Sequence, residues 1–94
     1  MEKEIFRIEL EKQIEILETV GEQLDNILQN NPWEILRGKI VFDDWNVQKV
    51  YRDTMKTYIS YSNLLKELES LCKDNGYLDV LKDIAMLKFE KGII

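Results

Sequence analysis

Apolar residues recur at seven-residue intervals in two long stretches of this sequence. The first stretch carries them at Leu10, Ile14, Leu17, Gly21, Leu24 and Leu28, and the second carries them at Val47, Tyr51, Thr54, Tyr58, Tyr61, Leu65, Leu68 and Cys72. Such paired rows place an apolar seam along one side of a helix, and the seam requires a partner helix. The sequence therefore predicts an all-α fold. Because Gly21 lies within its seam, we expect another backbone to approach closely there.

Three helices account for most of the chain. Strong helix formers without proline predict the first helix over residues 2–29, and Asp43 is suited to cap a second helix over residues 44–75. Their similar lengths and short connection favour an antiparallel hairpin. Gly76 ends the second helix, a third follows over residues 77–91, and Ile93-Ile94 forms an apolar tail. We expect one helical domain over residues 1–94.

The connection between the two long helices contains the only proline. Asn31 is a suitable cap, Pro32 suits a first helical position, and Glu34 stands where a capping-box acid belongs. The pattern predicts a short helix over residues 32–37 that ends at Gly38, followed by an extended link over residues 39–42. The apolar residues of this link and Trp33 would close one end of the bundle.

The apolar stripes are broader than one short third helix can cover. Ile5, Ile8 and Ile16 lie outside the seam of the first helix, so that helix is expected to meet neighbours on more than one side. An uncovered apolar stripe marks an interface. We therefore expect a homo-oligomer, with a dimer favoured, that completes a four-helix or larger bundle. The alternative is a monomeric bundle of three or four helices.

The composition argues against most catalytic chemistry. The chain has no histidine and one cysteine, so Ser-His and Cys-His nucleophile pairs and Cys/His zinc sites are absent. The four glycines stand apart and form no phosphate-binding loop. We expect a protein that is not an enzyme and that uses neither a metal nor a cofactor. The sequence shows neither a signal-peptide layout nor an apolar run of membrane-spanning length, which favours the cytoplasm.

The excess negative charge lies in the first helix. The net charge is −5, and residues 1–30 contain eight acidic and three basic residues. Six of the acids form what we call the acidic ridge, on the side away from the seam: Glu4, Glu11, Glu15, Glu18, Glu22 and Asp25. The ridge could dock a basic protein, mimic nucleic-acid phosphates, hold a divalent metal as in all-helical nucleotide pyrophosphatases, or be a solvated helix face. For the metal reading, Asp79 and Asp83 are the other acids considered.

A smaller basic face begins the second long helix. Lys49, Arg52 and Lys56 lie near Arg37 and Lys39 in sequence. This face permits a helix-turn-helix interpretation in which residues 32–37 form the first helix. The alternative is pairing with the acidic ridge, within the chain or between subunits. The overall charge balance makes nucleic-acid binding unfavourable.

The aromatic residues and the cysteine have structural interpretations. Tyr51, Tyr58 and Tyr61 lie in the seam, where packing is the expected role. Trp45, like Trp33, flanks the connection, and either tryptophan would become a binding hot spot if it were exposed beside the basic face. Cys72 continues an apolar row, which predicts a buried, inert thiol.

The stretch from Asp44 to Gly76 reads as a tyrosine-containing helix that ends in glycine, and Tyr77-Leu78-Asp79-Val80-Leu81-Lys82 begins another helix after it. In this arrangement the stretch resembles phage small terminase subunits. The resemblance covers under half of the chain and implies ring-forming oligomers that bind DNA. It assigns no site residue, and the acidic first helix departs from it.

These observations favour a small helical protein–protein interaction module. It would present helix faces and the acidic ridge to a protein partner that has a basic surface, as an inhibitor or regulator from a mobile element or phage. The alternatives are a nucleic-acid-associated oligomer of the terminase kind and a carboxylate-metal helical enzyme.

Overall fold

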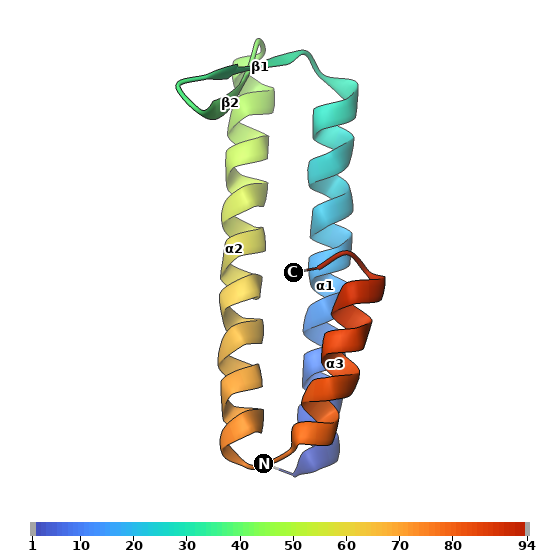
Figure 1. Ribbon diagram of the computed structural model, residues 1–94. Helices are drawn as coiled ribbons and strands as arrows, with labels where there is room; N and C mark the ends of the chain where they lie inside the picture. Colours follow the sequence, from blue (N-terminus) through green and yellow to red (C-terminus); the bar gives the residue numbers. More distant parts are fainter. Residues whose placement is uncertain (1, 94) are drawn as a thin grey trace.

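The computed structural model describes residues 2–93 and shows a mostly α-helical rod. Its elements are α1 (Lys3–Asn30), β1 (Trp33–Leu36), β2 (Lys39–Phe42), α2 (Trp45–Asp74) and α3 (Leu78–Glu90). α1 and α2 run side by side as an antiparallel hairpin, and α3 folds back along the half of the hairpin that holds the start of α1 (Figure 1). The predicted all-α hairpin with a third helix is confirmed, and each helix bound lies within one residue of the one expected.

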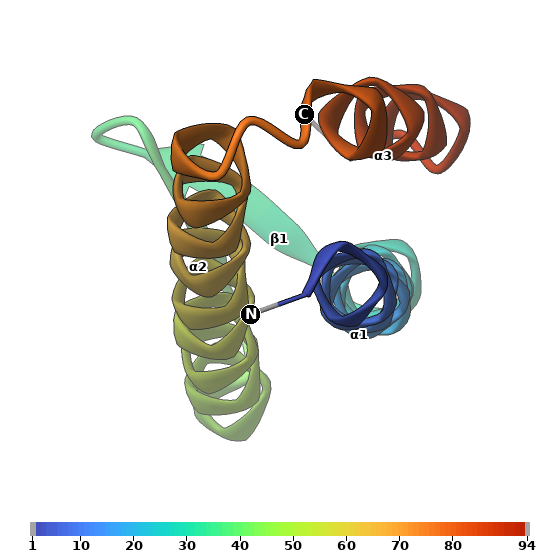
Figure 2. The same cartoon turned by 90° about the horizontal axis from the view of Figure 1, so that it is seen from below.

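The three helices form a triangular bundle along only half of the rod. Figure 2, seen along the rod, shows α3 on one side of the plane of α1 and α2. The rod measures 48 × 20 × 20 Å, and its radius of gyration is 16.1 Å, against about 12 Å for a compact chain of this length. Beyond the end of α3, the hairpin consists of two helices and the small β-sheet alone.

Two apolar clusters hold the rod together. The larger cluster fills the three-helix half and includes Phe6, Leu10, Ile14 and Leu17 of α1 against Leu65 and Cys72 of α2 and Val80 and Ile84 of α3. The smaller one, at the other end, is formed by Leu24, Phe42 and Tyr51. The Phe42 and Tyr51 rings lie 5.0 Å apart, which attaches the β-sheet to α2.

The predicted short helix over residues 32–37 is wrong. This segment forms strand β1, which pairs with β2 in register Trp33↔Phe42 and Ile35↔Ile40. The intervening Arg37-Gly38 pair has positive φ angles of 52° and 77°, the backbone of a two-residue hairpin turn. Gly38 therefore turns a hairpin rather than ending a helix, and the helix-turn-helix interpretation loses its first helix.

The β-hairpin formed by β1 and β2 is fixed to α1 and α2 by hydrogen bonds. The Trp33 indole Nε1 donates to the carbonyl oxygen of Leu28 at 2.9 Å, and the Phe42 amide donates to the Gln48 side chain at 2.7 Å. The extended link over residues 39–42 is observed as β2, and Phe42 closes the bundle end as expected. Trp33 and Ile35 stay exposed, so they do not close it.

Helix α2 begins and ends at well-defined caps. The Asp44 carboxylate, rather than the expected Asp43, accepts from the amides of Asn46 and Val47. At the other end, Gly76 adopts a φ of 75°, its amide donates to Lys73, and the Tyr77 amide donates to Cys72, which is a Schellman motif. This turn reverses the chain and sends α3 back along the hairpin.

Helix α3 ends in the same motif at Gly92, whose φ is 70°. The turn directs Ile93 into the larger core cluster, where it is buried. Ile94, the other residue of the expected apolar tail, lies outside the described residues.

Candidate interaction surface

The seam residues lie between the helices with two degrees of burial. Those buried are Leu10, Ile14, Leu17, Leu24, Tyr51 and Leu65, and those half-buried are Gly21, Leu28, Tyr58, Tyr61 and Leu68. The expected approach of a backbone at Gly21 is not observed. The nearest group is the Tyr58 ring, so the glycine faces a side chain.

The acidic ridge lies on the outer surface of α1, but α3 divides it. Glu11 lines a groove with Asp83 and Glu90 of α3, whereas Glu22 and Asp25 line another groove beyond the end of that helix. Glu4 lies near the start of α1, and Glu15 borders a third shallow groove with Ile16. The ridge is therefore a surface that two helices share rather than one continuous row on α1.

Glu18 is the ridge residue that α3 ties down. Its carboxylate is 3.0 Å from the Lys91 ammonium, and the pair lies at the groove that also holds Glu22 and Asp25. The hydrogen bond with Glu18 and the nearby carboxylates raise the pKa of Lys91 above its usual value. This ion pair holds the end of α3 against α1.

Two basic residues of α1 bind acidic residues of α3 near the start of α1. Arg7 donates to the Asp83 carboxylate at 2.8 Å, and the ridge residue Glu4 lies 3.8 Å from the same guanidinium. The hydrogen bond with Asp83 is the main reason why the pKa of Arg7 is raised. Lys3 forms an ion pair with Asp79, and this pair lowers the pKa of the Asp79 carboxyl.

These contacts bear on the carboxylate-metal interpretation. Asp79 and Asp83, the acids considered for a facing metal ligand pair, are each bound by a cation of α1. Within residues 2–93, no group of three or more His, Cys, Asp or Glu side chains is arranged to hold a metal ion.

Four ridge carboxylates stay exposed without an ion pair in the described part of the chain: Glu11, Glu15, Glu22 and Asp25. The basic face does not pair with them. Lys49, Arg52 and Lys56 are exposed near the other end of the rod, and the structure shows no ion pair for them among residues 2–93. The intramolecular form of the expected pairing between basic face and ridge is therefore not observed.

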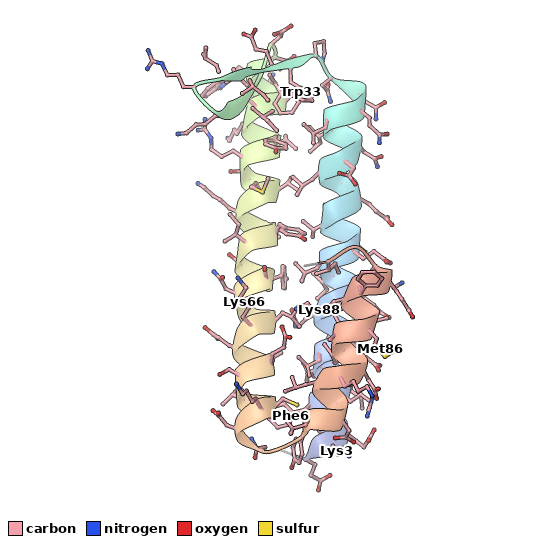
Figure 3. All side chains as sticks on the ribbon, viewed as in Figure 1. Lys3, Phe6, Trp33, Lys66, Met86 and Lys88 are labelled. Atoms are coloured by element: carbon pink, nitrogen blue, oxygen red, sulfur yellow. The ribbon has the colours of Figure 1, made fainter. Side chains whose placement is uncertain are left out.

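The two tryptophans differ in exposure. Trp33 marks the sheet end of the rod in Figure 3 and is anchored by its hydrogen bond to Leu28. Trp45 is 69% exposed, one turn before Lys49 on α2. Trp45 is therefore exposed beside the basic face, as a hot-spot tryptophan there would have to be.

Two interior polar groups stand out. The Cys72 thiol is buried, its Sγ lies 3.7 Å from the Tyr77 carbonyl oxygen, and burial raises its pKa. Gln13 is only 7% exposed, and its Oε1 atom has no hydrogen-bond partner within residues 2–93. A buried acceptor without a partner lowers the stability of the fold.

A second row on α2 was not predicted from the sequence. Val50, Thr57, Leu64 and Leu71 are spaced by seven and are exposed on the outer flank of the helix. They alternate with the row of Val47, Thr54, Tyr61 and Leu68 at spacings of three and four, the sequence signal that could have identified them.

Comparisons with known proteins return no match to this chain, whether with protein-family models, curated proteins or solved structures. None of the helices in the described part of the chain is both long and apolar enough to cross a membrane.

Proposed function

We propose that this chain is a non-enzymatic helical module that binds other polypeptides, with the acidic ridge as the contact for a partner that has a basic surface. The observation that carries the proposal is the set of exposed ridge carboxylates that form no ion pair within residues 2–93. Two of them, Glu22 and Asp25, border an open groove where a lysine or arginine of the partner fits between charges.

The rigidity of the ridge supports this role. Lys91 binds Glu18 at the end of α3, and Arg7 bridges Glu4 and Asp83, so the ridge is held against α3 at two points along α1. Prearranged charges speed the encounter with an oppositely charged partner and select against other partners. A cytoplasmic inhibitor or regulator from a phage or mobile element would use such a ridge to occupy a basic surface of its target. Mimicry of nucleic-acid phosphates is one form of that function.

Self-association is part of the same proposal. The exposed apolar residues include Ile8 on α1 and Val50, Leu64 and Leu71 on α2, which α3 leaves uncovered. A dimer is the smallest assembly that hides such a surface.

The ridge is tested by charge reversal with a matched control. The double variant Glu15→Lys, Glu22→Lys changes the net charge by the same amount as the control Glu34→Lys, Asp43→Lys, which lies at the sheet end of the rod. Each tagged protein is used for capture from its native cell, and the captured partner is then purified and titrated at two salt concentrations. The ridge variant should lose the partner, whereas the control should keep it, and binding should weaken at higher salt. Equal capture by both variants would refute the ridge as the binding surface.

A nucleic-acid-associated oligomer is the second candidate, and the unpaired basic face favours it. Lys49, Arg52 and Lys56 follow the exposed Trp45 along one face of α2, with Lys49 one turn away, and a ring next to a cation is suited to stack on a base. A gel-shift series over salt concentration tests this candidate with Lys49→Glu and the control Lys66→Glu. Binding that only Lys49→Glu weakens would support it, and no shift at low salt would reject it.

A further inference from the structure

The outer flank of α2 carries a row of eight residues without any charge. The half of the row nearer the β-sheet contains Val47, Val50, Thr54 and Thr57. The other half contains Tyr61, Leu64, Leu68 and Leu71. The spacing alternates strictly between three and four, which is the pattern of a coiled-coil seam, in a chain that is 33% charged. We call this row the outer seam.

The outer seam is only half used within the chain. Tyr61 and Leu68 pack on the edge of the larger core cluster, and Val47 packs on the smaller one. The alternate positions remain open to solvent: Val50 is 54%, Leu64 39% and Leu71 50% exposed. A helix laid along this row would bury the exposed residues and cover the outer edge of the core.

The outer seam lies on the side of the hairpin that α3 leaves open. Lys88 of α3, labelled in Figure 3, pairs with Glu69 of α2, and Leu71 points about 160° away from Glu69 around the helix. Near the sheet, Val47 and Val50 share a groove with Ile27 of α1. Ile27 in turn lies about 180° around α1 from Glu18, the residue that Lys91 binds.

The surface area of the chain matches what a dimer requires. The accessible surface is 6789 Å², whereas a compact monomer of 11.2 kDa has about 5,700 Å². The excess of roughly 1,100 Å² per chain is close to the area of about 600–1,000 Å² that each partner buries in a standard interface.

The two halves of the outer seam are complementary in size. One half has four small β-branched side chains and the other has four large ones. An antiparallel copy of α2, related by a twofold axis between Thr57 and Tyr61, sets every large residue against a small one of the partner. Tyr61 then meets Thr57, Leu64 meets Thr54, Leu68 meets Val50, and Leu71 meets Val47. A parallel copy would place Leu64 and Leu71 against themselves and leave the small half loosely packed.

We propose that the outer seam is the interface of an antiparallel homodimer, in which α2 packs against α2 of a second copy. This inference rests on the self-association in the proposed function, and it assigns the surface and the orientation. The acidic ridge lies on α1 outside the seam, so the dimer leaves the ridge free for a partner.

The experiment has two parts, and the first uses substitutions that the monomer tolerates. Leu64→Glu places a charge in the outer seam at an exposed position, and Ile59→Glu, which is also exposed on α2 but about 140° around the helix, is the control. Mass in solution is measured by light scattering over a range of concentrations, and helicity is measured by circular dichroism. We expect a dimer for the wild type and Ile59→Glu, and a monomer of unchanged helicity for Leu64→Glu.

The second part reads the orientation from disulfides. In a Cys72→Ser background, Thr54→Cys and Leu64→Cys are made as separate proteins, oxidised alone and oxidised as a mixture. Residues 54 and 64 are about 15 Å apart along α2, too far for a disulfide within a chain. The antiparallel dimer should give the covalent product only in the mixture, whereas a parallel dimer would cross-link each protein alone.

The outcomes separate this inference from the proposed function. A wild-type dimer that Leu64→Glu does not dissociate, or cross-links in the unmixed samples, would overturn the inference and leave self-association standing. A wild type that stays monomeric at every concentration would overturn the inference and the self-association together. In either case, the capture experiment with the ridge variants decides on the ridge independently.

Discussion

The ring of Tyr58 lies against Gly21, with its Cε2 atom 3.7 Å from the place that a Cβ atom of residue 21 would occupy. That separation is ordinary van der Waals contact, so the site has room for a methyl group. The glycine lies inside α1, where alanine is the better helix former.

Gly21→Ala should therefore stabilise the protein by about 1 kcal/mol, which raises Tm by roughly 4–8 °C for a chain of this size. Thermal unfolding followed by circular dichroism measures the change. Gly76→Ala is the control in the opposite direction, because residue 76 has a φ of 75°. A lower Tm for Gly21→Ala would mean that the contact with Tyr58 is tighter than the structure shows.

The buried Gln13 side chain predicts a second stabilising substitution. Gln13→Met keeps the length of the side chain and removes the Oε1 atom that has no partner among residues 2–93. We expect the free energy of unfolding to rise by about 1 kcal/mol, because the cost of desolvating that acceptor disappears. Urea denaturation measures it, and the exposed Gln23→Met on the same helix should change stability little. A destabilised Gln13→Met would show that the amide is satisfied in solution.

The turn of the β-hairpin, between β1 and β2, predicts a third stabilising substitution. Arg37 has a φ of 52°, which a side chain other than glycine or asparagine adopts at a cost, and its side chain is exposed. Arg37→Asn produces the Asn-Gly pair that two-residue hairpins prefer, and it should stabilise the protein by up to about 1 kcal/mol. Gly38→Ala should destabilise it by a similar amount. If neither substitution moved the denaturation midpoint, the turn would not be formed in solution.

The long helices could be predicted from the sequence because each signal was repeated over many turns. The seven-residue rows and the helix formers agree on the extent of both long helices, and Asn75-Gly76 marks the end of α2. The connection could not, since Asn31, Pro32 and Glu34 satisfy a helix start as well as a strand, and Gly38 serves a helix end and a hairpin turn alike. Four residues are too few for periodicity to decide between the two.

The ridge was predictable only as a helix face. Its spacing placed the carboxylates on the outside of α1, but the ion pairs of Glu18 with Lys91 and of Arg7 with Asp83 depend on the side of the hairpin that α3 takes. No local pattern in α3 specifies that side, because its direction follows from the turn at Gly76 and from the packing of Val80 and Ile84.

The Lys3–Asp79 pair predicts a dependence of stability on pH. The pKa of Asp79 is lowered in the folded chain, first by its bond with Lys3 and also by the backbone amide of Val80. The folded chain therefore binds fewer protons than the unfolded chain below about pH 4. The contribution of Asp79 is complete above that pH and is lost as the pH falls through the folded-state pKa.

Asp79→Asn should consequently be less stable than the wild type at neutral pH, and the difference should close in acid. Urea midpoints measured from pH 7 downward follow the difference, with Asp25→Asn, an exposed carboxylate without an ion pair in residues 2–93, as the control. A constant difference over the whole pH range would assign the effect to packing or helix capping rather than to ionisation.

The Cys72 thiol should react slowly with thiol reagents in the folded protein. It is fully buried in the larger core cluster, and burial raises its pKa, so the thiol stays protonated and unreactive at neutral pH. A thiol-reactive reagent can reach it only when the chain opens, so labelling should be about a thousandfold slower than for an exposed thiol. The comparison protein is Ser70→Cys in a Cys72→Ser background, which places a cysteine on the exposed side of α2. Denaturant should remove the difference between the two rates. Fast labelling of Cys72 in the native protein would show that the α2–α3 corner opens readily. It would also be evidence against the stable packing of α3 on α2 at Glu69.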